Sequence, residues 1–266
     1  MIFTSIFTPL ISPIIILQTN NKMKNVFKTI TLVAIAMMAF TQVSTAQTAD
    51  EIINKYVNAI GGEDRINNIK TVRMSITGEY GIQLKGTIYQ KMPNLMRTDV
   101  VFQNVTMTFA AYDGTTAWSK NPMAGGDKAQ KAEAETTLEM SEDVFPTPLY
   151  KYQEHNYKAT LEGQEVIEGV ACYKIKMTSP SGADSYYFID SENYVPIMVR
   201  SFIRSGEGKG KAIESYFSDY QEVEGVMMPF ATTQKADGET IGSSTVTKVE
   251  INAADFDEKI FAFPGN

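Results

Sequence analysis

Residues 86–122 read GTIYQKMPNLMRTDVVFQNVTMTFAAYDGTTAWSKNP. In this stretch and just before it, three segments alternate between apolar and polar residues; the apolar ones are Leu84, Ile88, Met96, Val100, Phe102, Val105, Met107 and Phe109. A period of two is typical of strands with one dry face and one wet face. Pro93 with Asn94, and Asp113 with Gly114, are turn signals. The stretch therefore predicts three consecutive antiparallel strands, and its long, flexible apolar side chains could line a cavity.

The same pattern continues on both sides of this stretch. Upstream, Val72, Met74 and Ile76 alternate with polar residues, and downstream seven further strand-like segments cover residues 157–161, 171–178, 184–190, 195–203, 212–220, 226–234 and 243–251. Short turns separate them, so about eleven strands should pair in chain order. We expect one mainly β domain over residues 47–266, a highly curved antiparallel sheet that forms an incomplete, half-open barrel covered by helices.

Helices are expected before the strands and between two groups of them. Thr48 and Glu51 have the spacing of a capping box, and apolar residues then repeat at helical spacing up to Ile60, where Gly61 and Gly62 end the helix. We expect this helix to act as a lid over the open face of the sheet, through Ile53, Val57 and Ile60. A shorter helical piece covers residues 63–69. Residues 127–140 are rich in Ala, Lys and Glu and predict a helix that is either a movable lid or a solvated surface helix.

The first 46 residues have the pattern of a secretory signal. From Met23, two lysines precede an apolar run over residues 30–40, and small residues end at Ala46. That run is shorter than the roughly 20 residues a membrane-spanning helix needs. We therefore expect cleavage after Ala46, with Met23 as the true start and residues 1–22 as a gene-model extension. An alternative is that both apolar runs act together as an anchor.

Charge and cysteine content limit the partners. Without residues 1–46 the chain has 21 basic and 31 acidic residues, a net charge of −10. Such a surface opposes nucleic acid and anionic lipid headgroups as general partners. Cys172 is the only cysteine, so no disulfide can form within the chain. We expect it to be a buried or half-buried strand residue, and because no cysteine follows the signal, we expect a periplasmic protein without a lipid anchor.

Patterns that carry catalysis are missing from the sequence. His155 is the only histidine, and neither a nucleophile elbow, a metal-ligand spacing nor a phosphate-binding glycine loop is present. We therefore expect a protein that is not an enzyme and that needs no cofactor or metal. A pair of carboxylates distant in sequence, as in glycosidases, stays open as an alternative, and an enzyme acting on lipid or glycan would need acidic or hydroxyl groups inside the cavity.

An ordered set of residues resembles a known family. The set is Gly86, Lys91, Pro93, Asn94, Leu95, Asp113, Gly114, Trp118, Asn121 and Pro122, and near the C-terminus Asp255, Phe256, Phe261, Phe263 and Pro264 are similar to the closing strand of the same family. This family is the LolA-like periplasmic carriers of outer-membrane lipoproteins. The resemblance implies a monomeric, chaperone-like carrier that shelters lipoprotein or lipid acyl chains and exchanges them with inner- and outer-membrane transfer machinery. A non-enzymatic periplasmic sensor of lipid or lipoprotein with the same fold is the alternative.

The alternation and the resemblance together predict an acyl-chain cavity. Its expected lining is Met74, Ile76, Leu84, Ile88, Met96, Val100, Phe102, Met107, Phe109 and Trp118. The methionines could equally be core filler, and Trp118 could be a packing residue. One position departs from the family, because Met92 stands where an arginine usually precedes the proline and helps to hold the lid. Arg97 could replace it only by pointing inward, whereas the alternation predicts that it lies on the face opposite Met96 and Val100.

Overall fold

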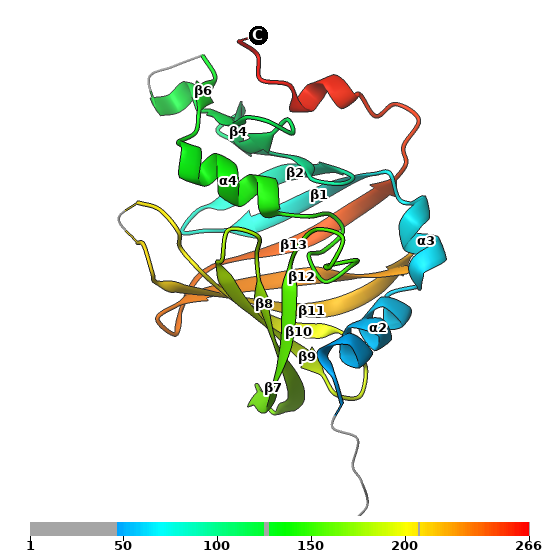
Figure 1. Ribbon diagram of the computed structural model, residues 1–266. Coiled ribbons are helices and arrows are strands. Elements are labelled where there is room, and N and C mark those ends of the chain that lie inside the picture. The colour runs from blue at the N-terminus through cyan, green and yellow to red at the C-terminus, as the bar shows by residue number, and fades with distance from the viewer. Residues whose placement is uncertain (1–46, 125–127, 207, 266) are drawn as a thin grey trace, which may run out of the picture. The chain divides into compact units, whose positions relative to one another are not determined.

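The computed structural model describes residues 47–265, apart from 125–127 and 207 (Figure 1). The predicted signal peptide and the predicted gene-model extension lie outside the described residues. Among the helices that are described, none has both the length and the apolar character to cross a membrane.

The described residues form one antiparallel sheet of thirteen strands. These are β1 (Thr71–Glu79), β2 (Gln83–Lys91), β3 (Leu95–Phe102), β4 (Val105–Tyr112), β5 (Ala117–Lys120), β6 (Gln130–Lys131), β7 (Lys158–Ile167), β8 (Val170–Thr178), β9 (Asp184–Asp190), β10 (Pro196–Phe202), β11 (Ala212–Val223), β12 (Val226–Ala236) and β13 (Glu239–Ile251). Their order is β6-β5-β4-β3-β2-β1-β13-β12-β11-β10-β9-β8-β7 (Figure 1). Because β6 and β7 are the two ends of this order, the sheet is open, as predicted.

Each of the eleven predicted strands has a counterpart in the sheet. The two additional strands are the short β5 and β6 at one edge. They contain four and two residues, too few for an alternating pattern to be recognised. Three of the predicted turns have positive φ at both central residues, at 168–169, 224–225 and 237–238. This geometry is that of type I′ hairpins, which keep sequential strands adjacent.

Helix α2 (Ala49–Ala59) begins at the predicted capping box. The backbone N–H of Glu51 donates to the Thr48 hydroxyl at 3.2 Å, and the backbone N–H of Thr48 donates to the Glu51 carboxylate at 3.0 Å. The apolar side of the helix is buried through Ile52, Ile53 and Tyr56. These side chains pack with β8 and β9 residues in the largest core cluster. The short helix α3 (Glu63–Asn68) follows and buries Ile66.

The position of α2 shows that the sheet curls around it. The helix lies beside β7, and at its other end the Ile60 carbonyl accepts a hydrogen bond from Met227 N–H of β12 at 3.1 Å. Strands β7 and β12 are five steps apart in the sheet order, about 24 Å along the sheet. An eleven-residue helix is about 16 Å long. One helix therefore reaches both strands only because the sheet between them is curved.

The third helix differs from its expected position. We predicted a helix over residues 127–140, but α4 spans Ala134–Glu142 and lies against β4 and β5 (Figure 1). Position 127 lies outside the described residues, and Gln130 and Lys131 form β6 instead of helix. Residues of high helix propensity are overridden here by backbone pairing with β5. A 3₁₀ turn, η1 (Pro122–Ala124), precedes this region.

The C-terminal segment is not the closing strand that the resemblance implied. β13 ends at Ile251, and residues Glu258–Phe261 form a 3₁₀ turn, η2, begun by the Asp257 side chain, which accepts from the Lys259 N–H. Aromatic side chains fix the segment, because Phe256 contacts Tyr89 of β2 at a ring-centroid distance of 6.2 Å. The prediction of a strand was wrong because the apolar residues here pack individually instead of alternating.

Cys172 is buried, as predicted. It lies on β8 in a cluster with Ile167, Phe188 and Met198, on the face opposite to α2. Burial raises the pKa of its thiol to about 11. A thiol that stays protonated at neutral pH is a packing group and not a nucleophile.

We predict that Ile52→Ala lowers the free energy of unfolding by about 2–5 kcal/mol, since the fully buried side chain leaves a cavity between α2 and the sheet. Urea unfolding followed by circular dichroism measures the change. Val57→Ala on the same helix is the control, and because Val57 is only half-buried its effect should be clearly smaller. Equal effects of the two substitutions would contradict the burial of α2 described above.

Candidate functional site

Eight of the ten predicted lining residues share one face of β1–β4. Directly paired residues of antiparallel strands point to the same face, and the register pairs Met74 with Ile88, and Val100 with both Gly86 and Met107. Alternation along each strand adds the other four. We call this set the apolar face, and its members are Met74, Ile76, Leu84, Ile88, Met96, Val100, Phe102 and Met107.

The apolar face is incompletely covered. All eight of its residues are half-buried. In contrast, Ile175, Met177 and Ile189 under α2 are fully buried. Met74 lies at the border, packed against a buried cluster that includes Val72 and Phe145. The α2 side of the sheet therefore has a finished core, whereas the β1–β4 side keeps apolar side chains within reach of solvent.

A pocket of about 430 Å³ opens on the apolar face. Four members of the face line it, namely Leu84, Val100, Phe102 and Met107. Ile82 and Phe109 add apolar groups to its lining. The pocket is a place where an apolar ligand could remove these side chains from water.

Two predicted lining residues are placed differently. Trp118 pairs with Ala111, and Ala111 pairs with Arg97, so all three side chains point to the face opposite the apolar face. The Trp118 Nε1–H donates to the Phe261 carbonyl at 2.9 Å. Trp118 is therefore a packing residue beneath the C-terminal segment. Phe109 sits where the β3–β4 register shifts and is 75% exposed, so it lines the pocket from an exposed position. A bulge breaks the alternation that placed Phe109 with the others.

The three predicted lid residues belong to the core under α2. Ile53 and Ile60 are buried in the largest cluster, and Val57 packs against it. Their partners there include Tyr173, Ile175 and Ile189 of β8 and β9, none of which belongs to the apolar face. The helix thus contributes to the stability of the β7–β12 side.

Arg97 lies on the face opposite Met96, as the alternation predicted. Its guanidinium bonds to Asp99 at 2.8 Å and to the Ile260 carbonyl at 2.8 Å, with the Trp118 ring 5.5 Å away. It therefore fixes the C-terminal segment. Met92, at the family's arginine position, packs against two core clusters, so neither residue provides a cation that holds a helix over the face.

The cation that holds α4 comes from a distant loop. Arg204, between β10 and β11, pairs with Glu142 at the end of α4 at 2.6 Å. The same carboxylate accepts from Ser179 Oγ at 3.0 Å and from the Ser181 N–H at 2.7 Å. We call these four residues the α4 latch. No signal in the sequence predicted this contact, because nothing in the local pattern connects positions 142 and 204.

The α4 latch is charged at neutral pH. Burial alone would raise the pKa of Glu142, but Arg204 and the serine donors outweigh burial, and the pKa is lowered. Its stabilising contribution is therefore present above the ordinary glutamate pKa and is lost as pH falls through the lowered value. A second, more exposed pair links Lys209 to Glu135 at 3.0 Å.

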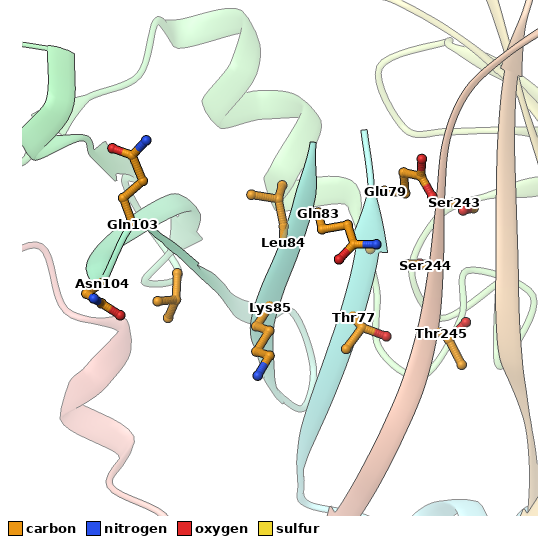
Figure 2. A pocket seen from close by; sticks show the side chains of 12 residues that line it. Thr77, Glu79, Gln83, Leu84, Lys85, Gln103, Asn104, Ser243, Ser244 and Thr245 are labelled. Carbon is orange, nitrogen blue, oxygen red and sulfur yellow. The ribbon is translucent and has the colours of Figure 1, made fainter. Parts of the chain in front are cut away.

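A larger pocket, about 670 Å³, is lined mostly by polar residues of β1, β2 and β13 (Figure 2). Thr77 and Lys85 line it and pair with each other on the face opposite Leu84. Gln103 and Asn104 contribute from the β3–β4 turn (Figure 2). An apolar chain would gain little there, so this pocket is not the better candidate site.

The described part of the chain contains neither a metal-binding cluster nor a catalytic triad around His155. No group of three or more His, Cys, Asp or Glu side chains there is arranged to hold a metal ion. His155 lies in a turn, half-buried, and within the described residues its ring makes no hydrogen bond to a nucleophile or an acid.

Comparisons with known proteins identify the fold. A family model described only as "Uncharacterized protein" matches residues 148–263. No match is found among curated proteins. A LolA superfamily protein from Nitrosomonas europaea superimposes with a TM-score of 0.55 and 14% identity, over 82% of this chain and 98% of that one.

Two further solved structures are similar. A DUF1329 family protein from Desulfovibrio piger gives a TM-score of 0.52 at 10% identity, covering 80% of this chain and 97% of that one. A domain from Vibrio parahaemolyticus, described as an outer membrane lipoprotein-sorting protein, gives 0.51 at 8% identity, covering 79% and 94%. The chain therefore has the LolA-like fold, and at these identities the similarity concerns the fold alone.

We predict that Arg204→Ala loosens α4, because it leaves the buried Glu142 carboxylate without its cation. Removing one partner of a buried pair costs about 3–5 kcal/mol, so amide exchange over Ala134–Glu142 should accelerate by two orders of magnitude or more. Hydrogen exchange with mass spectrometry measures this. Lys209→Ala, which breaks the exposed pair on the same helix, should cost less than about 1 kcal/mol. Equal protection of α4 in both variants would show that the latch does not hold the helix.

Proposed function

We propose that this chain is a non-enzymatic periplasmic carrier whose apolar face shelters the acyl chains of lipids or lipoproteins on their way to the outer membrane. One observation carries the proposal. Eight apolar side chains share one face of β1–β4, and every one of them is only half-buried, beside a core that is complete. A contiguous apolar surface that the protein covers only in part is a mark of a binding site for an apolar partner.

The energetics favour such a ligand. Each methylene removed from water contributes about 0.8 kcal/mol, so ten methylenes would supply roughly 8 kcal/mol before the cost of association is subtracted. The methionines Met74, Met96 and Met107 suit this role because thioether chains adapt to ligands of different shape. A surface of this kind would select for acyl character and not for one particular acyl chain.

Reversible binding follows from the position of α4. The helix lies on β4 and β5, two strands that also line the pocket on the apolar face. Its polar ties to the far side of the sheet are the α4 latch, the Lys209–Glu135 pair and a hydrogen bond from the Tyr157 hydroxyl to the Glu142 carbonyl. A helix held by a few polar contacts can shift to admit a chain and return when the chain leaves. In this proposal Arg204 has the role that an arginine near the proline has in the family.

Two further considerations support the proposal. The LolA-like fold occurs in the Vibrio parahaemolyticus domain described as a lipoprotein-sorting protein. The predicted signal peptide would deliver the chain to the compartment in which lipoproteins travel between membranes. The lining of the apolar pocket includes the hydroxyls of Thr108 and Ser119 but no acidic, basic or histidine side chain. The Thr108 hydroxyl donates to Asp99 at 2.9 Å. A lining without an acid, a base or a histidine favours sheltering over catalysis.

We predict that Val100→Asn weakens binding of a fluorescent long-chain fatty acid at least fivefold, since it places an amide in the middle of the apolar face. Fluorescence titration at neutral pH measures the dissociation constant. Val101→Asn is a matched control one residue away on the same strand, where the side chain is 41% exposed on the opposite face. The proposal fails if both variants bind the probe as the unmodified chain does.

A further inference from the structure

A second pocket, of about 280 Å³, lies between α2, residues 143–148 and strands β10–β12. Four aromatic residues line it, namely Tyr56, Tyr187, Phe217 and Tyr220. Asp143 is the only charged residue in its lining. We call this the aromatic pocket.

The aromatic pocket continues the apolar face. Gln90 lines the pocket and pairs with Met96, two residues beyond Ile88 on the same face of β2. A chain lying on the apolar face could therefore place one of its ends in the aromatic pocket. The two pockets differ in chemistry, since only the aromatic one contains a formal charge.

Asp143 has no partner among the described residues. The residue reaches solvent, but its carboxylate lies among protein atoms and makes no hydrogen bond or ion pair with a described residue. The adjacent Glu142, in contrast, is fully engaged by the α4 latch. Surrounding protein atoms raise the pKa of Asp143, and the nearby Glu139 adds to this effect. Arg204, which pairs with the adjacent Glu142, is committed to that carboxylate. A cation entering the pocket would supply the missing partner.

The tyrosine hydroxyls have neighbours within the protein. Tyr220 Oη–H donates to the Pro196 carbonyl at 2.7 Å. The Thr147 side chain lies beside the hydroxyls of Tyr56 and Tyr187 and partly offsets the rise in pKa that burial gives them. What these residues still offer a ligand is the ring itself. Aromatic rings beside a carboxylate are the recurring recognition site for ammonium groups, through cation–π attraction and a counter-ion.

We propose that the aromatic pocket binds the ammonium group of an acylated ligand, with Asp143 as its counter-ion and the rings of Tyr56, Tyr187, Phe217 and Tyr220 around it. The inference rests on the proposed function, because the acyl part of the ligand would occupy the apolar face. No basic residue lines the pocket, so it disfavours a phosphate or carboxylate end. The net charge of −7 for the whole chain also favours a cationic ligand.

Calorimetric titration with dodecylamine and dodecanol, two probes of equal chain length, tests the proposal. At neutral pH and below the concentration at which either probe aggregates, we expect the ammonium probe to bind at least tenfold more tightly. Asp143→Asn should reduce the ratio of the two affinities to about one, and Phe217→Leu, which keeps apolar volume but removes a ring, should reduce it several-fold. Asp237→Asn, the same chemical change at the exposed β12–β13 turn, should leave the ratio unchanged.

The outcomes separate this inference from the proposed function. If the chain binds both probes equally, or if Asp143→Asn preserves the preference, the ammonium site is wrong while acyl binding stands. If neither probe binds, both are wrong.

Competition against bound dodecylamine identifies the source of the ammonium group. Displacement by lysophosphatidylethanolamine but not by lysophosphatidylglycerol indicates a lipid headgroup. Displacement by an acylated peptide with an adjacent lysine indicates a lipoprotein. Displacement by neither would overturn the site.

Discussion

The packing of α2 inside the curve of β7–β12 is the interaction on which the rest of the structure depends. A large antiparallel sheet with one apolar face has to hide that face, and one helix of eleven residues covers only part of it. Ile52, Ile53 and Tyr56 complete a core on one side. The same arrangement leaves β1–β4 with a half-covered apolar face, so the stability of one side and the openness of the other have a common origin.

Much of this could be predicted from the sequence, because a period of two is local information. Alternation placed Met74, Ile88, Val100 and Met107 on a common face, and the observed register agrees. The prediction failed for two residues whose positions depend on more than the local alternation. Phe109 lies at a bulge, and no residue type in the sequence marks that bulge. Trp118 is covered by a C-terminal segment more than 130 residues away in sequence.

The charged contacts could not be predicted for the same reason. Glu142 and Arg204 are 62 positions apart, and only the completed sheet brings them within 2.6 Å. A buried pair of this kind adds little net stability compared with apolar packing, but it fixes one geometry because either partner alone is costly. Its place at the end of α4 lets a few polar contacts determine how the helix lies beside the apolar face. Asp143, the next residue, differs from Glu142, because its carboxylate has no ion-pair or hydrogen-bond partner among the described residues.

Native mass spectrometry with lipid extraction, on protein purified from the periplasm of its own source, tests the central claim most directly. The account predicts a stoichiometric complex with a lipid or an acylated protein, which dissociates to the bare chain on activation. A chain that is recovered empty and that also takes up no added lipid would contradict the account. In that case the apolar face of β1–β4 would be a poorly covered part of the core and not a binding site.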